Sequence, residues 1–179
     1  MRLITLLVII TFMTFLGSSM YRPYFALFLK DRGISASEVG LIFIVFGLSY
    51  SFLSLPFGTL SDILGRRKSL LMGIIIEALA LASLPLIFDK FSAYLLAIVL
   101  GLGMAIIDPS LTAIPAEISL KQEFGKSFGI FASFLQLGLI LGPLFGGIFA
   151  TLYGYKPTAL WLNSLSFLCL ALIYVLVCC

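Results

Sequence analysis

Charged residues gather at one point of an otherwise apolar chain, in the segment GTLSDILGRRKSLL at residues 58–71. This segment holds two glycines and four charged side chains, namely Gly58, Asp62, Gly65, Arg66, Arg67 and Lys68. Between two helices, Asp62 would lie near the negative end of the first and the arginines near the positive end of the second. Each placement costs about 0.3–1 kcal/mol. These charges therefore need partners, which are either one another across the turn or, for Asp62, the positive end of another helix.

Three more charged residues, Arg22, Glu77 and Asp108, lie within long apolar segments. Glu77 has apolar neighbours on all sides and is expected to be a hydrogen-bonded carboxyl, which leaves Arg22 and Asp108 as the candidates for function. A charge within such a segment costs roughly 2.5–3.5 kcal/mol on insertion scales, so such residues usually face water or a partner. Arg22 follows Thr11, Thr14 and Ser18 at helical spacing, which predicts one polar helix face. The two charged residues either handle the charge of a substrate or a proton, or form a structural pair that holds two segments together.

The composition indicates the solvent that surrounds these residues. Of 179 residues, 61% are hydrophobic and 11% are charged. A soluble domain of this size cannot cover so much apolar surface, so we expect lipid around most of the chain. Histidine is absent and the three cysteines lack zinc-ligand spacing, so we expect no metal and no cofactor. The net charge of +3 is small, which argues against a nucleic-acid partner.

Several apolar segments are long enough to cross the hydrocarbon core as helices, which takes about 20 residues each. They cover residues 3–29, 37–57, 69–88, 92–116, 127–150 and 157–177. Backbone groups in lipid must bond within their own segment, so helices are expected. The sequence predicts an all-α membrane protein, with six transmembrane helices in a single domain over residues 1–179 and no soluble domain.

The basic residues predict the orientation of these helices. One side of the membrane would carry Arg2, Arg66, Arg67, Lys68, Lys121 and Lys126, and the other Lys30, Arg32, Lys90 and Lys156. The cluster of three within one turn favours the first side as cytoplasmic. We therefore expect a multi-pass protein of the cell membrane with both termini in the cytoplasm.

Glycines recur half a chain apart. Gly40, Gly58 and Gly65 have counterparts at Gly129, Gly147 and Gly154. With three helices in each half, the second triplet must insert upside down, and inverted repeats of this kind recur in secondary transporters. The prediction is two inverted three-helix repeats, and the alternative is chance among 16 glycines.

Two patterns carry a resemblance to a known family. The pattern Gly58-x-x-x-Asp62-x-x-Gly65-Arg66-Arg67-Lys68 resembles the signature loop of the major facilitator superfamily, although Ile63 replaces a basic residue. In the fifth segment, Gly138-x-x-x-Gly142-Pro143-x-x-Gly146-Gly147 resembles the GxxxGPxxGG motif of that superfamily, often seen in antiporters. A third motif, R-x-x-x-G-x-G, is partial, because Ala97 stands where the arginine would be.

The resemblance implies a fold and an activity. Members usually have twelve spans in two six-span halves around a central cavity, and this chain resembles the N-terminal half. The implied function is secondary transport of a small molecule by alternating access, without enzymatic chemistry. The loop aspartate would dock against the other half, and Arg22 and Asp108 would lie on the cavity wall. Because the chain ends in the apolar VLVCC, we expect a truncated or split transporter that works with a second half or as a homodimer.

The fifth segment carries its own physical argument. Gly138, Gly142 and Gly146 recur every four residues and line one helix face, where small residues let another helix approach closely. Pro143 removes one helix hydrogen bond and should bend the segment. This face is either a contact that moves during transport or static packing. Gln136, near these glycines, either lines the cavity or bridges helices.

Two other classes of function are alternatives to transport. A non-transporting membrane subunit, or a remnant derived from a transporter half, remains the alternative. An intramembrane enzyme is disfavoured, because the chain has no histidine, no metal cluster and no nucleophile–base pair at usable spacing. The fifth-segment motif favours export of small amphipathic compounds, whereas Ala97 argues against proton antiport.

Overall fold

The computed structural model describes residues 2–118 and 124–153 of the chain. Its long helices are α1 (Arg2–Asp31), α2 (Ala36–Leu64), α3 (Arg66–Ala82), α4 (Lys90–Ile118) and α5 (Phe124–Tyr153). A short 3-10 helix, η1 (Leu84–Leu86), joins α3 to α4. The helix predicted over 157–177 lies outside the described residues. The inverted repeats that depend on it stay a prediction.

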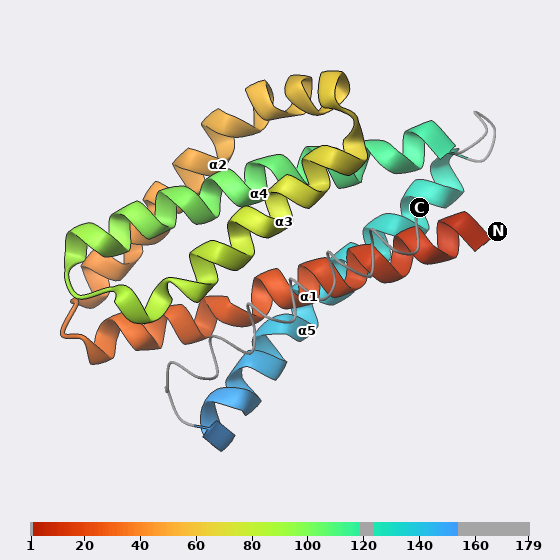
Figure 1. Cartoon of the computed structure of the whole chain (residues 1–179). Helices are drawn as coiled ribbons and strands as arrows, with labels where there is room; N and C mark the ends of the chain where they lie inside the picture. The colour runs from red at the N-terminus through yellow and green to blue at the C-terminus, as the bar shows by residue number, and fades with distance from the viewer. Residues whose placement is uncertain (1, 119–123, 154–179) are drawn as a thin grey trace.

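The helices run up and down between two ends of the molecule (Figure 1). The N-terminus, the α2–α3 turn and the end of α4 lie at one end, and the α1–α2 and α3–α4 connections lie at the other. The basic cluster at 66–68 is therefore at the same end as the N-terminus. This alternation is the arrangement that the distribution of lysines and arginines requires.

Local hydrogen bonds and ion pairs fix the first residues of α2 and α4, at the end of the molecule opposite the N-terminus. Ser35 caps α2, and Glu38 closes a capping box with it. The Glu38 carboxylate also forms a salt bridge with Lys90 at the start of α4. Hydrogen bonds from Ser92 lower the pKa of Asp89, so its carboxylate stays ionised at the positive end of α4. These contacts fix where α2 and α4 enter the bundle.

The polar stretch that we expected to be a linker, residues 58–68, is helical apart from one residue. Helix α2 continues to Leu64, and α3 begins at Arg66. Gly65 alone separates them, with φ of 92°, a region of backbone space that favours glycine. Charged and hydroxyl side chains can extend a helix beyond its apolar part, so the change in polarity did not mark the helix end.

Three described helices are long and apolar enough to cross a membrane, namely Ala36–Leu64, Lys90–Glu117 and Phe124–Ile148. Helix α3 has only 17 residues and ends at Ala82, short of the predicted boundary at residue 88. Helix α1 has 30 residues and covers all of the predicted segment 3–29. Length and composition thus support three of the six predicted spans.

The described helices pack as two groups. Helix α1 packs along α5, and α4 packs along both α2 and α3. Fully buried side chains such as Leu29, Ile42 and Leu100 form the core between them. The outer faces expose large apolar side chains, with Phe52 at 76% and Leu55 at 79% exposure. Faces this apolar are suited to lipid rather than water.

Candidate functional site

Arg66 is the centre of the polar cluster at the α2–α3 turn. Its guanidinium forms a salt bridge with Asp62, one helical turn earlier on α2. Its Nε lies 2.9 Å from Oε1 of Glu117 near the end of α4. This is the first of the two expected arrangements, in which the charges of the turn pair with one another. Glu117 adds a link to α4 that the turn alone did not predict.

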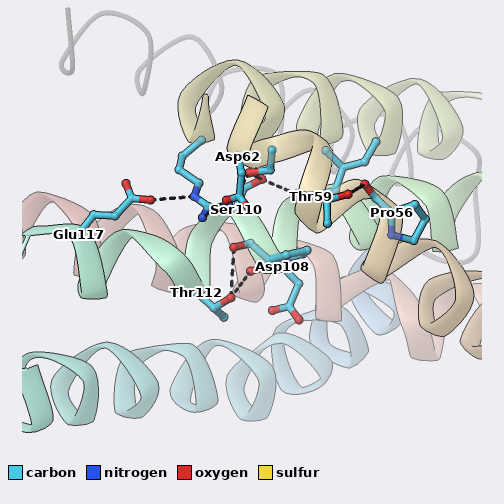
Figure 2. Close-up of polar contacts among 11 residues, drawn as sticks. Pro56, Thr59, Asp62, Asp108, Ser110, Thr112 and Glu117 are labelled. Atoms are coloured by element: carbon cyan, nitrogen blue, oxygen red, sulfur yellow. Dashed lines mark hydrogen bonds and ion pairs between the residues drawn. The ribbon is translucent and has the colours of Figure 1, made fainter. Parts of the chain in front are cut away.

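Buried hydroxyls extend this cluster into the bundle (Figure 2). Nη1 of Arg66 donates to Oγ of Ser61 at 3.0 Å, and the Ser61 and Ser110 hydroxyl oxygens lie 3.1 Å apart. Both serines are completely buried. One arginine therefore joins α2, α3 and α4 at this end of the molecule, and the Asp108 carboxyl points away from the cluster.

Replacing Arg66 by glutamine should lower stability modestly. Asp62 and Glu117 are more than half exposed, and exposed ion pairs contribute at most about 1 kcal/mol. The expected loss is about 2–4 °C in melting temperature, measured in detergent. Lys68→Gln at the same turn is the control, because Lys68 is exposed. An equal loss in both variants would contradict the specific role of the Arg66 contacts.

A cavity of about 280 Å³ lies between the two groups of helices. It is lined by Phe15, Arg22, Phe46, Tyr50, Met104, Asp108, Leu135 and Leu139, from α1, α2, α4 and α5. The structure thus brings together Arg22 and Asp108, the two charged residues singled out within apolar segments. Its other walls are aromatic and aliphatic, which suits a small amphipathic molecule.

Each charged group of this cavity has its own neighbour. The Tyr50 hydroxyl donates to Oδ2 of Asp108 at 2.5 Å. The Arg22 guanidinium carbon lies 5.7 Å from the centre of the Phe46 ring, a cation–π contact. Among the described residues, Arg22 forms no salt bridge with Asp108. The two charges face one space without neutralising each other directly.

A smaller cavity of about 120 Å³ adjoins Arg22 on α1. Its walls include Tyr21 and Arg22 of α1 together with Ala97 of α4. Ala97, the residue that departs from the third motif, is completely buried. Arg22 therefore lines both cavities and is their shared charged group.

The glycine face of α5 packs against α1. A Cβ atom at Gly138 would lie 2.8 Å from the Phe12 carbonyl oxygen, and one at Gly142 would lie 2.7 Å from that of Leu16. Ser19 of α1 also donates to the Gly138 carbonyl oxygen at 3.0 Å. This face is covered within the chain, so it is not free to bind a second copy. Gly147, the last motif glycine, has nothing within 4 Å of such a Cβ.

Other predicted residues stay apart from the cavity. Gln136 has an exposed side chain and does not line it, although Leu135 and Leu139 do. The hydroxyls of Thr14 and Ser18 donate to carbonyls of their own helix at 2.8 Å. The hydroxyls of the predicted polar face of α1 are therefore buried; those of Thr14 and Ser18 are satisfied within α1, whereas the Thr11 hydroxyl has no partner among the described residues. Only the last member of this face, Arg22, reaches the cavity.

Some residues of the site were not predicted. Tyr50 is the most important, because it holds the Asp108 carboxylate. Its position in the middle of an apolar helix, far from the ends where tyrosines usually anchor, was the available signal. Ser61 and Ser110 gave no such signal in the sequence, because serine is common in membrane helices. Within the part of the chain that is described, no three acidic, cysteine or histidine side chains group as metal ligands would.

The sequence of this chain matches a known protein family and several curated proteins. The sequence profile of the Major Facilitator Superfamily matches residues 7–178. An uncharacterized MFS-type transporter of Methanocaldococcus jannaschii is 32% identical over 148 residues, which is 83% of this chain and 38% of that protein. The quinolone resistance protein NorA of Staphylococcus aureus is 32% identical over 148 residues, 82% of this chain and 38% of NorA.

The match to these relatives covers less than half of their length, whereas the family profile covers nearly all of this chain. The turn motif and the glycine face lie within the matched region, at the two places where the sequence resembled the family. The family prediction is confirmed: the chain belongs to the Major Facilitator Superfamily.

Proposed function

We propose that this chain forms the N-terminal half of a secondary transporter that moves a small amphipathic molecule by alternating access. The observation that carries the proposal is the cavity between α1, α2, α4 and α5, in which Arg22 and Asp108 face one space beside aromatic rings. A cation and an acid at one site can bind the charged ends of a substrate, while Phe15 and Phe46 pack on its apolar part. A second six-helix half, or a second copy of the chain, would close the open side.

The turn cluster is proposed to set the balance between transport states. Arg66 ties Asp62 to Glu117, yet the Asp62 side chain is 58% exposed. It can therefore meet a helix of the second half in one state and leave it in the other. Such a contact shifts the equilibrium by the difference in its strength between the two states.

The direction of transport is proposed to be export. The support is the likeness to a quinolone resistance protein, together with the glycine–proline motif of α5. We propose quinolone-like compounds, aromatic molecules with charged groups, as the first substrates to test. The glycine face of α5 against α1 is proposed as the contact that moves.

Alternating access is tested by thiol labelling of the cavity. The full-length protein is produced with Cys169, Cys178 and Cys179 replaced by serine. A single cysteine, Met104→Cys, is then introduced at the cavity wall. An impermeant maleimide should label this cysteine from either side of oriented vesicles, and a quinolone should slow the labelling.

Two exposed positions serve as controls for sidedness. Ser37→Cys and Lys68→Cys lie at opposite ends of the molecule, so each should be labelled from one side only. Labelling of Met104→Cys from only one side under every condition would contradict alternating access. Two-sided labelling without quinolone transport would instead point to another substrate. If neither a matching second half nor a second copy supports transport, the chain is a non-transporting membrane subunit.

A further inference from the structure

The smaller cavity, of about 120 Å³ between α1, α2 and α4, has no part in the function proposed above. Arg22 is the one charged side chain among the described residues that line it. Apart from the Tyr21 hydroxyl, the rest of the wall is aromatic or aliphatic. Nε of Arg22 is a buried donor, and no acceptor for it lies among the described residues. A cation with a free donor in an apolar cavity favours an anionic ligand.

Aromatic rings surround the space beside this guanidinium. The rings of Phe25 and Phe43 meet edge to face, with centroids 6.0 Å apart, and both residues line the smaller cavity. The Phe46 ring lies 5.7 Å from the guanidinium carbon of Arg22 and lines the same cavity. Three rings beside one cation suit an anion that is attached to an aromatic group.

The two cavities share a wall and differ in charge. Arg22 and Phe46 line both of them, whereas Asp108 lines only the larger cavity, where it accepts the hydrogen bond from Tyr50. Leu100 of the smaller cavity and Asp108 of the larger one are eight residues apart on α4, which is about 12 Å along the helix. A ligand that reaches from one cavity to the other would therefore place its anionic group beside Arg22 and a cationic group beside Asp108.

Glu77 of α3, the remaining acid within an apolar segment, is not among the residues that line either cavity. Its side chain is buried, and its Oε2 forms no hydrogen bond with the described residues, so the bond expected from the sequence is missing at this oxygen. Helix α4 packs closely on it, because a Cβ at Gly103 would lie 3.2 Å from the Glu77 backbone nitrogen. Glu77 thus belongs to the α3–α4 contact and leaves the space beside Arg22 open to a ligand.

We propose that the smaller cavity binds a carboxylate carried on an aromatic ring, and that Arg22 is the residue that binds it. The substrate is then an aromatic zwitterion, with its carboxylate in the smaller cavity and its cationic group beside Asp108. This assignment rests on the function proposed above for the larger cavity. A guanidinium can donate two parallel hydrogen bonds to a carboxylate and balances its single charge. A phosphate monoester carries up to two charges and would leave the second one unbalanced.

Ala97 provides the room for this group. It is completely buried and has the smallest side chain in the wall of the smaller cavity. A single water needs roughly 10–15 Å³ of such space, so a cavity of about 120 Å³ can take a carboxylate and the ring atoms next to it. A larger side chain at this position would occupy the space without changing the charge of Arg22.

The test compares two ligands that differ only in the carboxylate. One is a rigid biphenyl with a carboxylate at one end and an aminomethyl group at the other, and the second is its methyl ester. Binding of each to the full-length protein in lipid nanodiscs is measured by equilibrium dialysis. We expect the acid to bind about tenfold to a hundredfold more tightly, through its charged hydrogen bonds. Equal affinities would overturn the proposal, as would the absence of binding by either compound.

Two variants should abolish this preference from different helices. Arg22→Gln removes the cation and Ala97→Leu fills the cavity, so in each the ratio of the two affinities should fall close to one. Arg32→Gln is the matched control, because Arg32 is exposed just beyond the end of α1 and is not among the residues that line either cavity. A preference that survives Arg22→Gln, or that Arg32→Gln also abolishes, would contradict the role of Arg22. If a variant does not fold, the two ligands on the unaltered protein still decide the proposal.

Transport of the same two compounds into vesicles separates this inference from the proposed function. A preference in binding for the acid, without transport of either compound, would contradict only the proposed function. Transport of the acid and the ester with equal affinity would contradict only this inference.

Discussion

Gly142→Ala should destabilise the protein by about 1–3 kcal/mol and lower its melting temperature by roughly 3–10 °C. The new Cβ would lie 2.7 Å from the Leu16 carbonyl oxygen and still closer to the Ser19 hydroxyl. Ser19 can turn its hydroxyl away, but the backbone of α1 cannot yield without moving the helix. Helices α1 and α5 must then separate, and the hydrogen bond from Ser19 to the Gly138 carbonyl weakens. Thermal unfolding in detergent measures the effect.

Gly147→Ala is the matched control, five residues further along α5. Nothing lies within 4 Å of a Cβ at this position. Because alanine favours a helix over glycine by up to about 1 kcal/mol, Gly147→Ala should be neutral or slightly stabilising. If Gly142→Ala and Gly147→Ala destabilise the protein equally, the close α1–α5 contact is not the reason for glycine at position 142. Transport by the surviving Gly142→Ala protein then tests whether the face is a moving contact.

Asp108→Asn should reduce transport of a cationic substrate by about tenfold to a hundredfold, with little change in folding. Asparagine has the same shape and can still accept the hydrogen bond from Tyr50, which lies 2.5 Å away. The change therefore removes mainly a negative charge from the cavity. A charge-assisted hydrogen bond from the substrate cation to the Asp108 carboxylate would contribute about 1.5–3 kcal/mol, and this contribution is lost. Uptake of a cationic dye into vesicles gives the measurement.

Tyr50→Phe separates the charge of Asp108 from its hydrogen bond. This variant keeps the carboxylate in the cavity and loses only the donor, so its transport defect should be smaller than that of Asp108→Asn. Asp62→Asn, at the distant turn, should leave the affinity of the cavity for the dye unchanged. Normal transport by Asp108→Asn together with a lower folding yield would contradict a role in the cavity. Asp108 would then be a structural residue.

The sequence predicted those parts of the fold and site that depend on local patterns. Long apolar runs predicted the helices, and mid-segment charges marked Arg22 and Asp108, which line one cavity. The four-residue spacing of Gly138, Gly142 and Gly146 predicted close packing, but the partner helix depends on tertiary structure. The signature motif identified the family, which the profile match confirms.

The failures have specific physical reasons. Residues 58–64 were expected in a linker because they are partly polar, but a helix ends where the backbone changes, and here that is Gly65. Gln136 was favoured for its place beside the motif glycines, and the neighbouring Leu135 and Leu139 are the residues of that stretch that line the cavity; a role for Gln136 stays a prediction. Tyr50 was missed because its importance comes from Asp108, which is 58 residues away in the chain.

The single residue between α2 and α3 has a mechanical consequence. Gly65 is the whole connection between Leu64 and Arg66, so no loop separates the two helices. A tilt at the end of α2 would move α3 with it, because the salt bridge between Arg66 and Asp62 also links the two helices. Glu77 lies eleven residues along α3, about 16 Å from Arg66. Movement at the membrane surface would thereby reach a carboxyl in the interior without any flexible loop to absorb it.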